Sequence, residues 1–489
     1  MQGCKHFEPR LFYDVSLEKL VPEDHLVRRL TAVLDLSWVR SATARLYSHT
    51  GRPSIDPVVV AKLLLLGYFY NIDSERQLMR DVQVNLAYRW YLGYDLDEEI
   101  PDHSILSKAR RRFGTAFFEQ LFEFTLGCCQ DAGLVAGQNV LIDSTIVQAN
   151  ASLDSLSTLR YRPADYWQQL EQQTEPATDS QDSDRHLGQK RPRQDRTSDR
   201  KYSKTDPDAS LYRRRCREPK LAYKTHILAD SGNGVITAVA TSSAAADDTS
   251  VVPQLIEDHE HRCGRPIRAV ADQLYGSQDC LGYLQDRGIE TVIGQRKGGN
   301  KHGGFDKSVF EYDFDRDVYR CPAGEILRRR RTDKSNSKAF YSCDSAVCGR
   351  CRLREQCIPC AGPDGFRQVT RFDTGYVERA QASCDSKEGR RLLKRRQTCI
   401  EGLFGQAKSQ HGLDRARLRG LPKMHIQGLL TAIVLNIKKL LAAVYRLKAV
   451  VCCRGSGKFG DIPALIVHRL FGFHWEGFCL GFGHGNVFR

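Results

Sequence analysis

The spacing of apolar residues changes at Gln138, and this change limits what the chain can fold into. In residues 1–135, apolar residues recur at helical spacing, and residues 56–70 are apolar at nearly every position, as in a helix buried on most sides. From Gln138 to residue 295, short apolar runs alternate with helical segments, which is typical of an α/β sheet. We therefore predict an all-helical N-terminal domain followed by a mixed sheet flanked by helices.

Changes in composition divide the rest of the chain. Residues 152–218 are rich in Gln, Asp, Ser and Arg, which favours a mobile insertion. Residues 296–365 are rich in Gly, Lys and Cys, and residues 449–489 have no pattern that indicates a structure. The expected units are 1–135, a helical domain; 136–295, the first part of the sheet domain; 296–365, a Cys-rich insertion; 366–448, the second part of the sheet domain; and 449–489, a tail.

Charge and cysteine usage restrict the partners and the compartment. Lys and Arg total 73 against 59 Asp and Glu, a net charge of +14, which favours an anionic polymer as partner. The 17 cysteines are odd in number and follow no signal peptide, so a reducing, cytoplasmic compartment is expected. Lysines interrupt the longest apolar runs, at Lys62 and at 438–439, and no membrane span is expected.

Three acidic residues stand at positions that suit catalysis. Asp143 and Asp272 each close a short apolar run, at 139–142 and 267–271, and Glu401 lies in a basic helix. They can meet only if the two strands are neighbours and the helix crosses their ends. Two carboxylates 4 Å apart repel by about 4 kcal/mol at an effective dielectric of 20, and bound divalent cations convert this repulsion into attraction. On spacing alone, ordinary strand-end and helix-surface acids remain the alternative.

The sequences around these acids resemble DDE transposases of bacterial insertion sequences. LIDSTIVQA (141–149), ADQLYGS (271–277) and CIEGLFGQAKSQHGLDRARLRG (399–420) are similar to the three catalytic blocks of that family, in order. The third block is the most specific, since it joins Glu401 to a Lys seven residues on and to HGL and RxRG elements. Residues 51–78 and 101–114 resemble the helical N-terminal domain of one branch, so the resemblance spans about residues 10–447.

The resemblance implies an RNase H-like core and an enzyme that rearranges DNA. Asp143, Asp272 and Glu401 would be catalytic and would bind two Mg²⁺ ions, with Mn²⁺ as the alternative ion. The reaction would be cleavage and strand transfer at the ends of the chain's own insertion sequence. Its partner would be double-stranded DNA, bound by a homodimer near the nucleoid, with the helical domain recognising the element ends.

Basic residues near Glu401 are the expected DNA contacts. They are Lys408, Arg395, Arg396, Arg417 and Arg419. Lys408 lies two helical turns beyond Glu401, where its ammonium could hold a DNA phosphate. The chain departs from the family at Lys394 and Gln397, where related enzymes carry Tyr and Arg. This departure affects the expected contacts to the reacting phosphate and leaves the three acids unchanged.

Six cysteines gather in the Cys-rich insertion. Cys348 and Cys351 form a CxxC, and Cys321 begins a turn suited to metal binding. Cysteines matching Cys321, Cys348, Cys351 and Cys357 recur in the resembling branch, so these four are the expected ligands of a structural Zn²⁺, with Cys343 and Cys360 as substitutes. Free thiols in a flexible loop are the alternative.

Two other functions fit the same sequence. The chain could be a catalytically inactive or repurposed DNA-binding protein derived from a transposase, or a metal-dependent nuclease that does not join strands. The three acids and Lys408 disfavour the first alternative, whereas the tail 451–489, which is unlike the rest of the chain, favours it.

Overall fold

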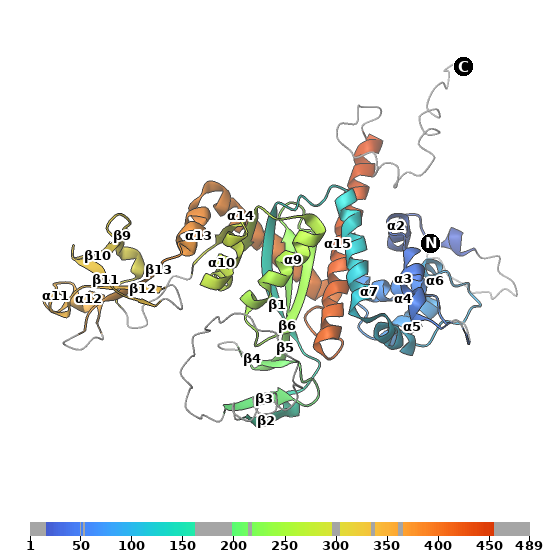
Figure 1. The fold of residues 1–489 in the computed structure, drawn as a ribbon. Helices are drawn as coiled ribbons and strands as arrows, with labels where there is room; N and C mark the ends of the chain where they lie inside the picture. Colours follow the sequence, from blue (N-terminus) through green and yellow to red (C-terminus); the bar gives the residue numbers. More distant parts are fainter. Residues whose placement is uncertain are drawn as a thin grey trace, which may run out of the picture.

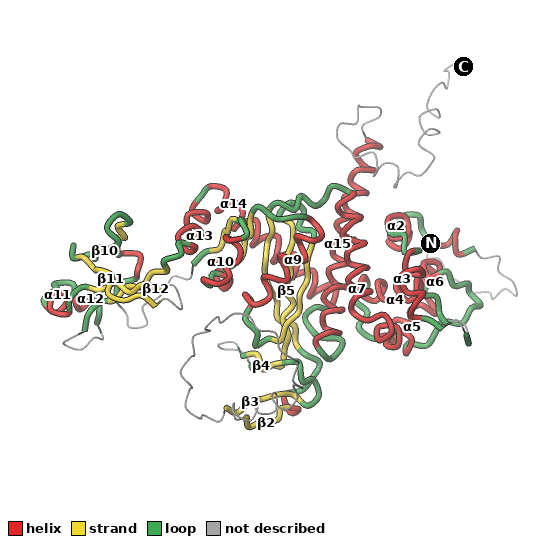
Figure 2. Tube along the Cα trace, in the orientation of Figure 1, coloured by secondary structure: helices red, strands yellow, loops and turns green. Residues whose placement is uncertain are grey.

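The computed structural model describes residues 16–48, 50–51, 54–161, 198–213, 218–295, 304–333, 338–359 and 365–453. Its parts follow one another along an elongated molecule: the N-terminal helices at one end, a large sheet in the middle and a smaller sheet at the other end (Figures 1 and 2). The expected tail at 449–489 lies outside the described residues from 454 onward.

The N-terminal region is helical, as predicted. Its elements are α1 (Leu17–Leu20), α2 (Leu26–Val33), α3 (Trp38–Thr43), η1 (Ala44–Leu46), α4 (Pro57–Phe69), α5 (Glu75–Val84), α6 (Leu86–Leu92) and α7 (Ser104–Asp131). Helix α4 starts where Asp56 accepts a hydrogen bond from the Val58 N–H and Pro57 takes the first helical position. Ten of its residues are buried, which accounts for its almost uniformly apolar sequence.

The central sheet mixes parallel and antiparallel strands. It contains β1 (Asn139–Gln148), β4 (Ser210–Tyr212), β5 (Lys220–Asp230), β6 (Ile236–Ser243), β7 (Arg268–Ala271) and β8 (Glu290–Ile293). Strand β1 pairs antiparallel with β5 and parallel with β7, and β7 pairs parallel with β8. Strands β4 and β6 both pair antiparallel with β5. The prediction of a mixed α/β sheet is therefore confirmed.

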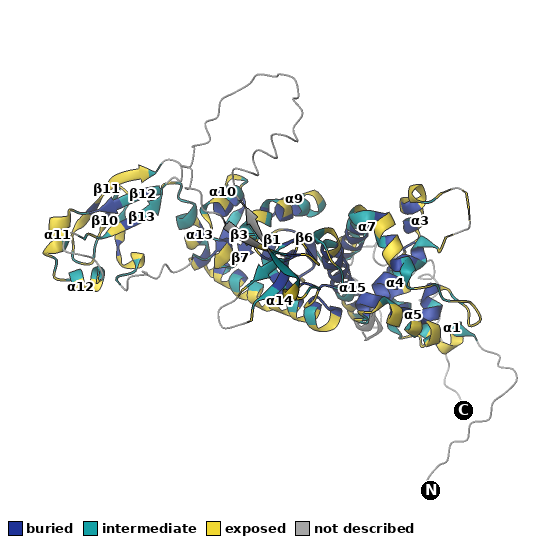
Figure 3. Ribbon diagram, turned by 90° about the horizontal axis from the view of Figure 1, so that it is seen from below, coloured by how far each residue is buried: buried dark blue, intermediate teal, exposed yellow. Residues whose placement is uncertain are grey.

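Helices cover both faces of this sheet. One face packs against α9 (Val252–Cys263), preceded by η3 (Asp248–Val251), and against α10 (Gln278–Asp286), preceded by η4 (Gln273–Tyr275). The other packs against α14 (Lys387–His411) and α15 (Leu421–Cys453), and its core continues into α4 and α7 of the helical region (Figures 1 and 3). Helix α13 (Tyr376–Asp385) packs against β8 and α10. The sheet and the N-terminal helices thus share one apolar core.

Helix α15 is the one helix, among the described residues, that is long and apolar enough to cross a bilayer. Its stretch Leu421–Arg446 has a mean hydropathy of 1.6, but 72% of the apolar window is buried inside the protein. The helix lies between the sheet and α7, where both of its sides meet apolar neighbours (Figure 1). Its hydrophobic surface is therefore used by the protein's own core.

Asn436 joins α15 to the edge of the sheet. The side chain is fully buried; its amide oxygen accepts from the Ile236 N–H at 2.8 Å, and its amide nitrogen donates to the Ile236 carbonyl at 2.8 Å. Strand β6 pairs with β5 on its other side, so the amide satisfies both backbone groups of Ile236 that face away from the ladder.

The structure describes only part of the first insertion, residues 152–218. Within 152–218, β2 (Leu156–Tyr161) follows η2 (Leu153–Ser155) and pairs with β3 (Ser198–Ser203), and β4 joins the main sheet. Residues 162–197 and 214–217, which carry most of the expected mobile insertion, lie outside the described residues.

The Cys-rich insertion forms a five-stranded sheet with its own small core. It comprises η5 (Lys307–Val309), β9 (Glu311–Asp313), β10 (Val318–Arg320), β11 (Ile326–Asp333), β12 (Lys338–Ser342), α11 (Ser345–Gly349), α12 (Arg354–Cys357) and β13 (Gln368–Phe372). Six buried side chains, including Tyr319 and Tyr341, form the core. A composition rich in Gly, Lys and Cys does not by itself indicate such a core, and β13 extends the sheet beyond residue 365.

We predict that replacing Asn436 by Ala destabilises the fold by about 2–4 kcal/mol, because two buried backbone groups lose their partners. Urea unfolding followed by far-ultraviolet circular dichroism measures the effect. The matched control is Asn233→Ala, which removes one exposed amide bond to the Leu134 carbonyl and should shift the midpoint little. Equal shifts for the two variants would contradict the role given to Asn436.

Candidate active site

Asp143 and Asp272 lie side by side on neighbouring parallel strands. Leu141 pairs with Val270, and two residues further along the same register bring Asp143 beside Asp272. Asp272 directly follows β7, as predicted, and its backbone is still extended. Asp143 does not end its strand as predicted, because β1 continues to Gln148 by pairing with β5. The acid is thus held on both sides by sheet.

Both acids face the side of the sheet that α14 covers. Residues two apart on a strand share a face, so Asp143 lies on the side of Leu141, and Asp272 on the side of Val270. Leu141 and Val270 belong to the core that contains buried residues of α14. A carboxylate supplied by α14 would therefore approach from the correct face.

The surroundings of Asp143 raise its pKa and also compensate its charge. Burial raises the pKa of Asp143, the Arg396 guanidinium and the Ser144 N–H lower it, and the nearby Asp272 carboxylate raises it. Arg396 Nη1 lies 2.8 Å from Asp143 Oδ2, with side-chain exposures of 15% and 22%. The Ser144 N–H donates to Asp143 Oδ1 at 2.8 Å. Asp143 thus has a cation at one oxygen and a backbone donor at the other.

Glu401 lies on α14 but on its exposed flank. Arg396 and Glu401 are five residues apart, which places them about 140° apart around the helix and about 7.5 Å apart along it. Arg396 points inward to Asp143, whereas Glu401 is exposed and forms no ion pair or hydrogen bond with any described residue. Lys408 lies about 20° from Glu401 around the axis, on the same flank.

The three acids are not assembled into a metal-ligand set. Among the described residues, no group of three or more His, Cys, Asp or Glu side chains is arranged to hold a metal ion. Asp143 and Asp272 are neighbours, and Glu401 belongs to the helix that covers them. The structure therefore brings two of the expected residues together and places the third on the adjoining helix.

Two family models match the chain. Residues 15–112 match a transposase domain of the DUF772 family, and residues 320–441 match a transposase DDE domain. The first covers most of the N-terminal helices; the second covers Glu401 and most of the Cys-rich insertion. The chain carries the domains of a DDE transposase. Asp143 and Asp272 lie between the two matched regions.

The comparisons with individual proteins add little to this result. No curated protein matches the sequence. Among solved structures, the chain is similar to piggyBac transposase in a synaptic complex with hairpin DNA, at 10% sequence identity and a TM-score of 0.35. The match covers 91% of this chain and 77% of the piggyBac chain.

Arg417, one of the expected DNA contacts, is bound within the protein itself. Its guanidinium donates to the Ile72 carbonyl at 3.2 Å and to Asn71 Oδ1 at 3.0 Å, pairs with Asp73 at 2.9 Å, and lies 4.4 Å from the centre of the Tyr68 ring. The side chain is only 11% exposed. Arg417 therefore ties the segment after α14 to the end of α4.

His411 makes a second connection between the same parts. Its Nδ1 lies 2.7 Å from the Tyr68 carbonyl oxygen, which can only accept, so Nδ1 carries the proton. Nε2 then accepts from Lys438 Nζ at 3.3 Å. Gly412, with a φ of +67°, leaves no room for a Cβ, which would lie 2.8 Å from the Arg417 guanidinium. The HGL and RxRG elements thus connect α14 to the helical domain.

The other expected DNA contacts differ in their availability. Arg395 donates to the Ser231 carbonyl at 2.9 Å and also to the Gly232 carbonyl, and Arg396 is paired with Asp143. Arg419 is exposed and donates one bond to the Asn150 carbonyl at 2.9 Å. Lys408 is half-buried, and burial lowers its pKa. Lys408 and Arg419 are therefore the two that remain most accessible to a phosphate.

The cysteine thiols of the insertion influence one another. Cys343 Sγ lies 3.1 Å from Cys348 Sγ. Burial raises the pKa of Cys343 to about 12, with further contributions from Cys348 and Cys321. Burial also raises the pKa of Cys357, which is affected by Cys321, Cys348 and Cys351. Cys343, expected only as a substitute, is thus close to the expected group, while Cys360 lies outside the described residues.

Asp248 is a half-buried acidic neighbour of the site that the sequence analysis did not single out. Its carboxylate accepts from Ser144 Oγ at 3.2 Å and pairs with Lys224 at 3.0 Å, on the face of β1 opposite Asp143. Asp248 is 104 residues from Ser144 in the sequence. No local pattern could have revealed this contact, because only the pairing of β1 with β5 creates it.

We predict that Arg417→Lys lowers stability by about 2–4 kcal/mol, because an ammonium cannot reproduce the several bonds of the buried guanidinium. Unfolding midpoints and limited proteolysis between the helical domain and the sheet measure the loss. Arg419→Lys, two residues away and exposed, is the control and should behave like the wild type. A stable Arg417→Lys protein would show that the connection does not hold the two parts together.

Proposed function

We propose that this transposase cleaves and joins DNA at the ends of its own insertion sequence, using divalent metal ions held by Asp143, Asp272 and Glu401. The observation that carries this proposal is the position of Asp143 beside Asp272 on parallel strands, under the helix that bears Glu401. Two adjacent carboxylates with a third on a covering helix suit phosphoryl transfer with metal ions.

The residues present fit Mg²⁺ or Mn²⁺ in kind. Mg²⁺ prefers carboxylate oxygens, and Asp143 and Asp272 supply them from a rigid sheet. Their charges repel, and Arg396 now compensates the charge of Asp143. Glu401 has no described partner to give up before it could act as a ligand. Asp143, Asp272 and Glu401 would hold the ions, and bound ions would activate the attacking oxygen and stabilise the leaving one.

The chain's own cations would hold the DNA during the reaction. Lys408 shares the flank of α14 with Glu401 and could bind a phosphate beside the reacting bond. Arg396 would exchange its contact with Asp143 for one with a phosphate as the carboxylate takes up a metal ion. The sheet keeps the two aspartates fixed, so little ordering is needed when the substrate binds.

We also infer an RNase H-like core. The order β6, β5, β1, β7, β8, with β1, β7 and β8 parallel and the first two strands antiparallel to their neighbours, supports this assignment. The helical region, whose core is continuous with that of the sheet domain, would recognise the element ends in double-stranded DNA. A homodimer that brings two ends together near the nucleoid completes the proposal.

Two alternatives use the same residues. A nuclease would cleave without joining, and an inactive descendant would bind DNA without cleaving it. The position of Asp143 beside Asp272 favours an active enzyme over the inactive form, because two half-buried like charges side by side repel each other and serve no structural role.

We predict that Asp272→Asn lowers cleavage by at least about 1000-fold, about 4 kcal/mol of transition-state stabilisation, and leaves DNA binding intact. A labelled duplex with the inverted repeats that flank the reading frame, incubated with Mg²⁺, measures cleavage and joining. Asp279→Asn, an exposed acid on α10, is the control and should react normally. Cleavage without joining would indicate a nuclease, and binding alone an inactive protein.

We further propose a structural zinc ion in the Cys-rich insertion, held by Cys321, Cys348, Cys351 and Cys357, with Cys343 as the substitute. Its support is the approach of Cys343 Sγ to within 3.1 Å of Cys348 Sγ and the turn in which the Gly324 N–H donates to the Cys321 carbonyl. The described thiols are not gathered around one point, so ion binding would have to draw them together. Thiolates bound to Zn²⁺ would stand about 3.8 Å apart. The apolar core of the insertion has only six buried side chains, so a bound zinc ion would add to the stability of the insertion.

We predict about one zinc ion per purified chain, and its loss in Cys348→Ser. Elemental analysis measures the metal, and protease sensitivity of the insertion after chelation measures its structural effect. Cys263→Ser, outside the insertion, should retain zinc. A wild-type protein without zinc, resistant to protease after chelation, would indicate that the insertion is held by its apolar core alone.

A further inference from the structure

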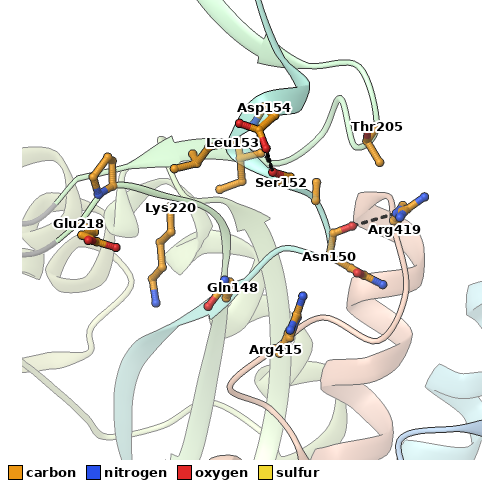
Figure 4. Close-up of a pocket in the computed structure, with 13 residues that line it drawn as sticks. Gln148, Asn150, Ser152, Leu153, Asp154, Thr205, Glu218, Lys220, Arg415 and Arg419 are labelled. Carbon is orange, nitrogen blue, oxygen red and sulfur yellow. Dashed lines mark hydrogen bonds between the residues drawn. The ribbon is translucent and has the colours of Figure 1, made fainter.

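A groove opens where β1 ends, beyond the catalytic acids. It has a volume of about 880 Å³ and is lined by Gln148, the segment 150–154, Lys220 at the start of β5, and Arg415 and Arg419 after α14 (Figure 4). Backbone bonds fix its floor: the Gln148 N–H donates to the Asp414 carbonyl at 2.9 Å, and the Ala416 N–H donates to the Gln148 carbonyl at 2.7 Å. The groove is thus built directly onto β1.

Two cations reach into the groove. Figure 4 shows Lys220, Gln148 and Arg415 directed into the same space. Neither Lys220 nor Arg415 forms an ion pair or a side-chain hydrogen bond with the part of the chain that the structure describes.

The remaining charges of the groove lie around these two cations. Arg419 is held at one side by the Asn150 carbonyl, and Asp154, at the far end from Arg415, accepts from Ser152 Oγ at 2.9 Å (Figure 4). Glu218 is the other acid of the lining. Among the described residues of the lining, three cations against two acids give the groove a net positive charge.

The groove continues the flank of α14 that carries Glu401 and Lys408. The Lys220 ammonium is close enough to Lys408 to help lower its pKa, after the effect of burial. Lys408 lies about 10.5 Å beyond Glu401 along the helix, and Gln148 lies about 16 Å beyond Asp143 along β1. Positive charge therefore runs from the acids along Lys408 to Lys220 and Arg415.

The side chains that line the groove suit the phosphate backbone of a nucleic acid better than its bases. None of the described residues that line the groove is aromatic, so they offer no platform for base stacking. Lysine, arginine and amide side chains are typical of contacts to phosphate oxygens, which position a nucleic acid without reading its sequence.

We propose that the groove formed by Gln148, Lys220, Arg415 and Arg419 binds the phosphodiester backbone of DNA several nucleotides from the reacting bond. This proposal rests on the proposed function, since it places the flanking strand relative to the three acids. The groove would fix the direction in which the strand leaves the catalytic acids, and its contribution would be independent of base sequence.

The first test is the salt dependence of DNA binding. The double variant Lys220→Gln, Arg415→Gln should reduce the slope of log Kd against log salt by about 2, because each lost phosphate contact releases about one counterion fewer. Binding to a duplex is measured with Ca²⁺ in place of Mg²⁺. The control Arg265→Gln removes an exposed cation that follows α9, on the opposite face of the sheet, and should keep the wild-type slope. Circular dichroism verifies that all variants are folded.

The second test locates the contact. Single neutral methylphosphonates are placed at successive positions on either side of the cleavage site. At the contacted positions they should weaken wild-type binding but leave binding by the double variant unchanged. At all other positions both proteins should respond alike.

The outcomes separate this proposal from the proposed function. If the wild type binds and cleaves DNA while the double variant keeps the wild-type slope, the groove proposal is wrong and the catalytic assignment stands. A variant slope that falls, with a methylphosphonate response confined to positions away from the cleaved bond, supports the groove even if the catalytic assignment fails. A wild type without affinity for DNA overturns both proposals.

Discussion

The parallel pairing of β1 with β7 is the constraint on which the candidate site depends. It fixes two carboxylates side by side at positions 129 residues apart in the sequence, so neither can relax away from the other without breaking the ladder. Burial alone would favour the neutral form of Asp143. The Arg396 guanidinium compensates its charge, and a divalent cation would do so more strongly. The sheet thereby holds two negative charges close together, and a cation bound beside them is stabilised.

Helix α14 connects these two carboxylates to the rest of the molecule. The helix packs its apolar stripe on the sheet and directs Arg396 inward, while Glu401 and Lys408 share an exposed flank. Immediately after the helix, His411 and Arg417 bind backbone carbonyls of the helical N-terminal domain. Any displacement of that domain therefore acts on the helix that carries the third acid, and the groove at the end of β1 lies against the same loop.

Much of the architecture could be predicted because it depends on local patterns. The Asp56–Pro57 start of α4, the strand that ends before Asp272 and the basic helix from Lys387 all follow from capping, periodicity and composition. The extent of β1 could not be predicted, because residues 144–148 are held in the strand by pairing with β5. The core of the Cys-rich insertion was missed because its aromatic residues are scattered among charged ones and meet only across strands.

The sequence by itself determined the chemistry available to this protein: acids in three separate blocks, a basic helix, and domains of a DDE transposase. Only the tertiary structure decided how these groups are used. It paired Arg396 with Asp143, placed Arg417 in a contact between domains, and directed Lys220 and Arg415 into one groove. The physical reason is that a side chain's role depends on its partners, and strand pairing and helix packing choose these from distant parts of the chain.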